Sequence, residues 1–131
     1  YRSVAKESFA RKLSMKLVEL EDRYSAVEMT YDPKTMGNIY DRAHGGVIFS
    51  LIDEAFETVG QADGTVGVAM NVSVTYVSSP DKETVLRAEA KEISRTRKTA
   101  GYAIVVKDQE KNLIATCQAL LYRTGKKIPF L

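Results

Sequence analysis

The spacing of apolar residues along this chain predicts one long helix followed by several strands. Residues 44–60 (HGGVIFSLIDEAFETVG) place apolar side chains on one wide helical face and end at a glycine, which is typical of an amphipathic helix. The helical period does not return after this segment. Residues 66–78, 84–96, 100–109 and 113–123 are rich in Val, Thr, Tyr and Ile and are separated by turn-forming residues, so we expect four long strands.

The segment before the long helix predicts a short helix and a hairpin. Apolar residues Ala5, Phe9 and Leu13 lie four apart among Lys and Arg, after a possible N-cap at Ser3, and indicate a short amphipathic helix over about residues 3–13.

Residues 16–30 alternate between apolar and polar, with Val18 and Leu20 on one parity and a break near Asp22, and so predict two strands or a hairpin. Residues 31–43 contain Asp-Pro and Gly-Asn pairs and predict a loop.

These elements define the expected fold class. One long helix among about six strands, with connections too short for parallel crossovers, indicates an α+β fold in which a curved antiparallel sheet packs against a central helix. We find no repeat or linker and expect residues 1–131 to form a single domain. One helix cannot cover every face and edge of such a sheet, so we expect a dimer or a larger assembly.

Composition narrows the classes of function. The chain has 131 residues, 44% of them hydrophobic and 27% charged, and a formal net charge of +2 with both signs interleaved, so nothing indicates nucleic acid as a partner. Its single cysteine, Cys117, cannot form an internal disulfide and favours a reduced compartment such as the cytoplasm. No run approaches the ~18 apolar residues that span a bilayer, and the first residues lack a signal-peptide pattern, so neither membrane insertion nor export is expected.

The start of the long helix is a candidate binding site. The first N–H groups of a helix lack internal partners, and the aligned peptide dipoles add about half a positive charge there. His44-Gly45-Gly46 leaves those amides open to a ligand oxygen, because glycine has no side chain to block the approach. The same residues also suit a tight turn from loop to helix, with His44 capping the helix or orienting the loop.

Asp53 is the candidate catalytic acid of this helix. It follows Gly45 by eight residues, which is about 12 Å along a helix. One chain cannot bring that carboxylate to a group held by the Gly45 amide, but two antiparallel helices across a two-fold axis can. The alternative is a solvated polar stripe, because the polar residues of the helix follow helical spacing. That stripe consists of Ser50, Asp53, Glu54, Glu57 and Gln61.

Two further residues admit a structural and a functional interpretation. Asn38 follows Gly37 and is either a turn residue or a ligand-binding amide. Cys117 alternates with Ala115 and Ala119 on a predicted strand, which favours packing over catalysis.

Read together, Asn38, His44-Gly45-Gly46 and Asp53 match the spacing N-x5-H-G-G-x7-D. This pattern resembles the hotdog-fold acyl-CoA thioesterases, specifically the phenylacetate-pathway (PaaI-like) branch of the 4-hydroxybenzoyl-CoA thioesterase superfamily. The likeness continues through residues 71–80 (NVSVTYVSSP) to Tyr122 and covers about 110 of the 131 residues.

The resemblance implies roles for these residues. Asp53 would be the catalytic carboxylate, acting as base or nucleophile, and the Gly45 amide, beside Gly46, would polarise the thioester carbonyl. Asn38 would hold water or substrate, with His44 as a secondary participant. It also implies a long helix wrapped by the sheet, active sites between the subunits of a homodimer that pairs into a homotetramer, and neither a metal nor a cofactor other than the coenzyme A of the substrate.

Two departures from the family pattern concern the substrate. Near the position of Ala69 the family often has a hydroxyl residue that positions water. That group is missing here unless Asn71 or Ser73 substitutes for it.

The turn that carries Arg95, Arg97, Lys98 and Thr99 lacks the glycine that relatives place beside a basic residue gripping coenzyme A. Its cations can hold nucleotide phosphates or form a solvated hairpin tip.

The predicted function is hydrolysis of acyl-CoA to a carboxylic acid and free coenzyme A. An amide at a helix end supplies charge stabilisation to the carbonyl oxygen, and a positioned carboxylate supplies the base or nucleophile. The alternatives are a hotdog hydratase or dehydratase, and a non-catalytic domain that only binds acyl-CoA.

Overall fold

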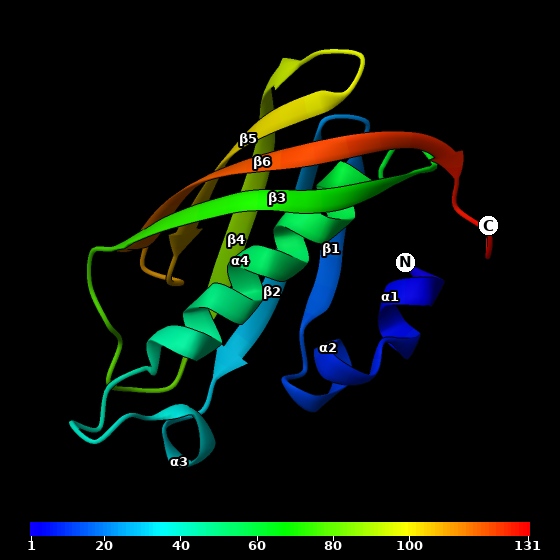
Figure 1. Ribbon diagram of the computed structural model, residues 1–131. Coiled ribbons are helices and arrows are strands. Elements are labelled where there is room, and N and C mark those ends of the chain that lie inside the picture. The colour runs from blue at the N-terminus through cyan, green and yellow to red at the C-terminus, as the bar shows by residue number, and fades with distance from the viewer.

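A six-stranded antiparallel sheet curves around one long helix in the computed structural model, which describes residues 1–131 (Figure 1). The helices are α1 (Arg2–Lys6), α2 (Ser8–Lys12), α3 (Pro33–Met36) and α4 (Gly45–Gly60). The strands are β1 (Lys16–Glu21), β2 (Tyr24–Tyr31), β3 (Thr65–Tyr76), β4 (Thr84–Arg95), β5 (Thr99–Lys107) and β6 (Leu113–Lys127). The predicted α+β class, the long helix and the late strands are confirmed.

The order of the strands is β1-β2-β4-β5-β6-β3, and every neighbouring pair is antiparallel. Strands β1 and β3 are therefore the two edges of the sheet. Strand β3 follows α4 directly in the chain, crosses to the far edge and pairs with β6 alone. This topology keeps one side of β3 open while its other side is held in the sheet.

Helix α4 is fixed because its apolar face is enclosed by the sheet. Leu51, Ile52 and Ala55 are fully buried, and Phe56 meets Tyr102 of β5 edge-to-face with ring centroids 5.7 Å apart. Truncating a side chain such as Leu51 to alanine typically costs about 2–5 kcal/mol. Helix α4 is thus a rigid base for the groups at its N-terminus.

Polar contacts also fix the helix. The Ser25 hydroxyl of β2 donates to the Ala55 carbonyl at 2.8 Å, and Thr58 donates to Ser25 at 3.1 Å. Cys117 of β6 is buried, as its predicted packing role requires, and burial raises the pKa of its thiol. The buried hydroxyls of Ser25 and Thr58 are therefore satisfied, whereas that of Tyr31 has no hydrogen-bond partner.

The N-terminal segment differs from the single predicted helix. It forms two short helices, because Glu7 between them has an extended backbone (φ −65°, ψ 122°). Ser3 caps neither helix; the N-cap of α1 is Tyr1. Phe9, predicted on the apolar face, is 50% exposed, and Ala10 is buried instead. The break rotates α2 relative to α1 and changes the face that meets the protein.

The predicted hairpin is confirmed, but its inward face differs from simple alternation. The register of β1 against β2 shifts between Leu17 and Glu19, so an extra residue enters the strand there. Val18 therefore points outward while Leu17 packs against the core.

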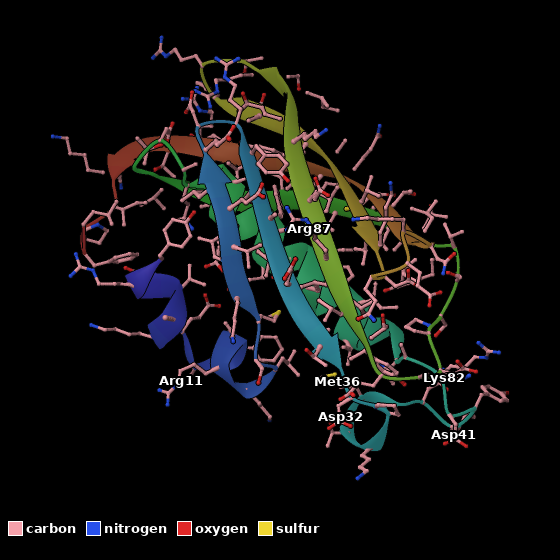
Figure 2. All side chains as sticks on the ribbon, turned by 180° about the vertical axis from the view of Figure 1, so that it is seen from behind. Arg11, Asp32, Met36, Asp41, Lys82 and Arg87 are labelled. Atoms are coloured by element: carbon pink, nitrogen blue, oxygen red, sulfur yellow. The ribbon has the colours of Figure 1, made fainter.

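On the outer surface of the sheet, Arg87 of β4 pairs with carboxylates, including that of Glu28 at 3.0 Å (Figure 2).

The predicted loop contains one turn of helix, α3, and then a tight bend that leads into α4. Asp32 caps α3 by accepting from the Lys34 N–H at 2.9 Å. Gly37 and Ala43 form an isolated antiparallel bridge, and Asp41 between them adopts a left-handed conformation (φ 57°). The bend thereby brings Asn38 close to the start of α4.

None of the helices combines the length and apolarity that crossing a membrane requires.

Candidate active site at the N-terminus of α4

His44 caps helix α4 and leaves one of its amides free. The Nδ1 atom of His44 accepts a hydrogen bond from the Gly46 N–H at 2.9 Å, so this nitrogen carries no proton. The Gly45 N–H, by contrast, donates to no atom of the chain. The capping interpretation of His44 is thus confirmed, and the bare donor at this helix end is the Gly45 amide rather than the Gly46 amide.

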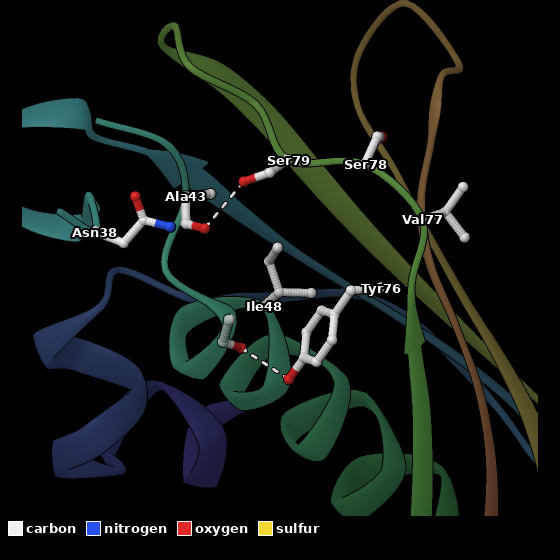
Figure 3. Close-up of a pocket in the computed structure, with 8 residues that line it drawn as sticks. Asn38, Ala43, Ile48, Tyr76, Val77, Ser78 and Ser79 are labelled. Atoms are coloured by element: carbon white, nitrogen blue, oxygen red, sulfur yellow. Dashed lines mark hydrogen bonds between the residues drawn. The ribbon is translucent and has the colours of Figure 1, made fainter. Parts of the chain in front are cut away.

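The free amide lies beside a pocket of about 330 Å³ formed by the bend before α4 and the end of β3 (Figure 3). A volume of this size is at the lower end of the range for small-molecule sites. The lining residues are Asn38, Ala43, Gly45, Ile48, Tyr76, Val77, Ser78 and Ser79. The structure therefore brings two of the predicted residues, Asn38 and Gly45, to one cavity.

Asn38 combines both roles that its sequence position allows. Its Oδ1 atom accepts from the N–H groups of Tyr40 at 2.9 Å and Arg42 at 3.2 Å, and this holds the bend in shape. Its amide nitrogen has no partner within the chain, and the residue lines the pocket. Asn38 is therefore a turn residue whose free N–H₂ group remains available to a ligand.

Tyr76 is a residue of the pocket that the sequence reading did not identify. Its hydroxyl donates to the Gly45 carbonyl at 3.1 Å, and its ring lies 3.4 Å from the position that a Cβ atom on Gly45 would occupy. Tyr76 thus holds the peptide at the start of α4 from the β3 side. No signal in the sequence separated it from the other aromatic residues of the predicted strands.

Asp53 does not line this pocket. It lies on the exposed face of α4, eight residues beyond Gly45, which is about 12 Å along the helix. Partial burial, and secondarily the negative charge of Glu57 one turn away, raise the pKa of its carboxyl. A single chain therefore holds the two halves of the predicted catalytic pair apart.

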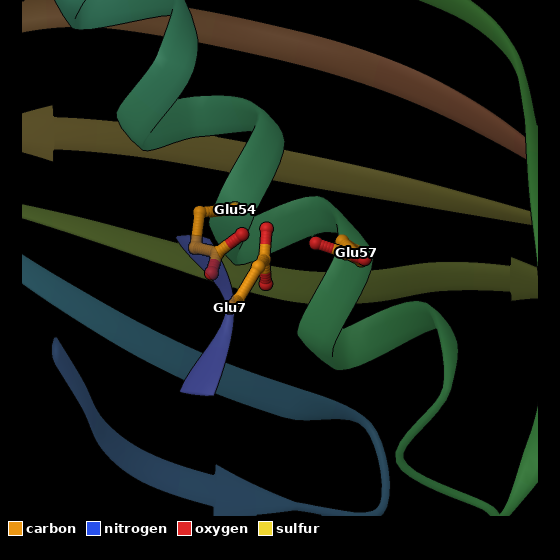
Figure 4. Close-up of side chains that lie close together, drawn as sticks. All are labelled: Glu7, Glu54 and Glu57. Atoms are coloured by element: carbon orange, nitrogen blue, oxygen red, sulfur yellow. The ribbon is translucent and has the colours of Figure 1, made fainter. Parts of the chain in front are cut away.

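The interpretation of the polar positions of α4 as one solvated stripe is wrong for Glu54. This residue is only 3% exposed, because the α1–α2 junction covers it, and its carboxyl lies close to those of Glu7 and Glu57 (Figure 4). Burial, followed by the two neighbouring carboxyls, raises the pKa of Glu54 to about 9. These three carboxyls are the one group in the chain with the donor set of a metal site.

Asn71 and Ser73 do not reach the pocket within one chain. Val72 and Val74, their neighbours on β3, pack against the core, so Asn71 and Ser73 point to the opposite face of the sheet. Ala69 is on the helix side, because the register of β3 shifts between Ala69 and Asn71. Neither residue therefore replaces, within the chain, the hydroxyl that the family pattern has at Ala69.

The predicted basic turn joins β4 to β5 and is only partly free. The Arg95 guanidinium binds the Glu92 carboxylate at 2.9 Å, and the Thr99 hydroxyl bonds that of Thr96 at 2.8 Å. Arg97 and Lys98 are exposed and form no ion pair. The cations available to a ligand are therefore two, not three.

The turn lies far from the pocket of its own chain. Thr99 is opposite Tyr122, which is opposite Val68 near the start of β3, whereas Tyr76 ends that strand. Eight residues of strand correspond to about 26 Å. Within one chain the basic turn, like Asp53, is therefore distant from the Gly45 amide.

The sequence and the fold identify the class of the protein. A family model described as the thioesterase superfamily matches residues 40–115, which include the end of the pocket bend, α4 and strands β3 to β5. The chain therefore belongs to the thioesterase superfamily, and the predicted resemblance to hotdog thioesterases is confirmed.

Individual relatives agree with this assignment. A putative esterase of Archaeoglobus fulgidus is 35% identical over 117 residues, covering 89% of this chain and 75% of the relative. The acyl-coenzyme A thioesterase PaaI of Escherichia coli is 24% identical over 122 residues, covering 93% and 86%. The E. coli PaaI structure superposes with a TM-score of 0.92 over 97% of this chain and 91% of that chain. A Streptococcus mutans protein, solved bound to acetyl-CoA, is 26% identical with a TM-score of 0.80 over 87% and 91%.

Proposed function

We propose that this thioesterase hydrolyses acyl-CoA to a carboxylic acid and free coenzyme A, without a cofactor, at sites shared between two subunits. The similarity to an acyl-coenzyme A thioesterase and to a protein solved with acetyl-CoA supports this substrate class. The observation that carries the proposal is the free Gly45 N–H at the start of α4, beside a pocket that also presents the Asn38 amide.

The reaction would use the two groups in complementary ways. The Gly45 N–H donates to the thioester carbonyl oxygen and stabilises the negative charge that develops there. The Asp53 carboxylate either removes a proton from an attacking water or attacks the carbonyl carbon itself. In the first route the C–S bond breaks, the water oxygen becomes the hydroxyl of the acid, and the thiolate of coenzyme A receives the proton. In the second, the thiolate leaves to give a mixed anhydride with Asp53, water hydrolyses that anhydride to the acid and the free Asp53 carboxylate, and the thiolate receives the proton released from this water.

A dimer across the β3 edge would join these groups. Antiparallel pairing of two β3 strands makes the two α4 helices antiparallel as well. A two-fold axis near Phe49, midway between Gly45 and Asp53, would set each Asp53 opposite the partner's Gly45. Phe49 supports this arrangement, because it is a large apolar side chain on the outer face of α4 and is 38% exposed.

The same symmetry would bring a basic turn to each pocket. Antiparallel pairing reverses the strand, so the Val68 end of one β3, close to the β4–β5 turn, lies toward the partner's pocket. Arg97 and Lys98 would then be available to the phosphates of coenzyme A as exposed charges without ion-pair partners. Pairing of two such dimers into a homotetramer is the assembly that we expect.

The test measures free thiol release from a panel of acyl-CoAs by the native chain and by Asp53→Asn. The variant is nearly isosteric, so its assembly, checked by sedimentation, should be unchanged, and we expect the rate to fall about 10²- to 10⁴-fold. Equal rates for both proteins would refute the role of Asp53. Tight binding measured by calorimetry without thiol release would refute hydrolysis, and hydration of crotonyl-CoA would indicate a hydratase instead.

A further inference from the structure

Three carboxyl groups converge on the side of α4 that the N-terminal helices cover. Glu7 comes from the α1–α2 junction, while Glu54 and Glu57 lie on α4, and one oxygen of each lies within 4.8 Å of the others (Figure 4). These groups are separate from the pocket, which none of them lines.

No positive side chain of the protein compensates this cluster. None of the ion pairs of the chain includes Glu7, Glu54 or Glu57. Glu54 is 97% withdrawn from solvent, given its exposed fraction of 3%, and its Oε2 atom has no hydrogen-bond partner. A buried carboxylate without a partner is strongly unfavourable, so Glu54 can carry its charge here only with a cation from outside the chain, and is otherwise a neutral acid.

The cluster is also accessible to ions and water. Glu7 and Glu57 form part of the wall of a groove of about 710 Å³ between α1, β1 and the C-terminal residues. A bound ion could therefore enter from solvent and keep water molecules on its open side. One oxygen of the Glu54 carboxyl would contact the ion from the protein side.

We propose that Glu7, Glu54 and Glu57 form a site for a hard divalent cation, of the class of Mg²⁺, Ca²⁺ or Mn²⁺. Carboxylate oxygens are the ligands that these ions prefer. The only histidine and the only cysteine, His44 and Cys117, are outside the cluster, so the donor set does not fit zinc or copper. The cation joins the α1–α2 junction to α4 and is a structural group, not a participant in thioester hydrolysis.

Mn²⁺ is the probe for this site, because calorimetry measures its binding and electron paramagnetic resonance counts the free ion. We expect one Mn²⁺ per chain in the chelator-treated protein of residues 1–131. We also expect saturating Mn²⁺, Mg²⁺ or Ca²⁺ to raise the Tm by at least about 3 °C relative to chelator, because a ligand of the native state stabilises it. Glu54→Gln should weaken Mn²⁺ binding at least about tenfold, since it removes the buried charge.

Two variants complete the test. Glu57→Gln changes an exposed ligand, so its folding is secure, and it should also weaken Mn²⁺ binding. Glu110→Gln removes an exposed charge from the β5–β6 turn and should bind Mn²⁺ as the native chain does. Absence of Mn²⁺ binding by the native chain at millimolar concentration, or equal binding by all three variants, would overturn the proposal. A proton shared among the carboxyls would then be the compensating group. None of these readouts depends on thioesterase activity.

Discussion

The two edge strands of the sheet differ in how readily each can pair with a strand of a second chain. Strand β1 is six residues long, carries a bulge and is packed against by helix α1. Strand β3 is twelve residues long, and its Val68 and Met70 side chains are 51% and 57% exposed. Short, bulged and covered strands resist pairing with another chain, whereas long strands with apolar side chains invite it.

This difference indicates where a second subunit belongs. The open edge follows α4 directly, and its last residue, Tyr76, contacts the Gly45 peptide. The protected edge lies on the other side of α4, where Glu7 reaches Glu54. Pairing at β3 would complete the candidate active site, while pairing at β1 would leave Asp53 and Gly45 apart.

The largest effect should come from blocking the open edge. Met70→Lys places like charges where two β3 strands would meet, so we expect sedimentation to show monomers at assay concentration. Thiol release should fall about 10²- to 10⁴-fold with the loss of the partner's Asp53, as if the base had been removed. Restored activity at high protein or salt concentration would accompany reassociation.

The matched control changes the protected edge in the same way. Val18 of β1 is 37% exposed, and Val18→Lys should leave both the mass and the rate of the native protein unchanged. A monomeric Val18→Lys protein, or a fully active Met70→Lys monomer, would contradict the assignment of β3 as the pairing edge.

The second effect concerns the amide beside the pocket. Gly45 is the first residue of α4, a position where proline fits helical geometry, and His44 before it already has an extended backbone (ψ 134°). Gly45→Pro should therefore remove the N–H donor with little change in folding and lower kcat about 10²- to 10³-fold. Gly45→Ala adds a Cβ at ordinary contact distance from Tyr76 and keeps the donor, so it should remain active. Equal loss in both variants would indicate a steric effect.

A third, smaller effect is the recovery of activity when two inactive variants are mixed. In a hybrid of Asp53→Asn and Gly45→Pro subunits, one of the two shared sites would contain both native groups. Equal mixing gives half hybrids, so about a quarter of the native rate should return after subunit exchange. The unmixed variants, taken through the same exchange, are the controls. No recovery despite hybrids detected by mass spectrometry would mean that each subunit works alone.

The sequence was informative wherever local periodicity or spacing determined the structure. The apolar face of α4, the late strands and the hairpin before Tyr31 followed from patterns that burial on one face imposes. Asn38 and Gly45 shared a motif, and the fold brings them to one pocket. These features depend on residues close together in the chain.

The features that were missed depend on contacts between distant segments. Glu54 has the helical spacing of a solvated residue, and only the α1–α2 junction, almost fifty residues earlier, buries it. Tyr76 differs from other strand tyrosines only because β3 ends beside Gly45. Ala69 faces the helix while Asn71 and Ser73 point away from it because the register of β3 shifts between Ala69 and Asn71, and no pattern of apolar residues announces that shift.

The smallest predicted effect tests whether Glu57, one turn along α4, influences the chemistry expected at Asp53. The charge of Glu57 contributes to the raised pKa of Asp53, after burial. The reaction needs the carboxylate, so activity is present above that pKa and is lost as the pH falls through it. In the presence of a chelator, so that no cation neutralises Glu57, Glu57→Gln should therefore move the acidic limb of kcat/KM to lower pH. The shift should stay below about one unit, because Glu57 is exposed and solvent screens its charge.

Salt provides the discriminating measurement for this last effect. Screening weakens an exposed pair of like charges, so the acidic limbs of the native chain and Glu57→Gln should converge at high ionic strength. Glu110→Gln, which removes a distant exposed charge, should leave the limb where it is at every salt concentration. A limb that moves equally in both variants would reflect overall charge rather than Glu57. A limb that moves to higher pH in Glu57→Gln would mean that the titrating group is not Asp53.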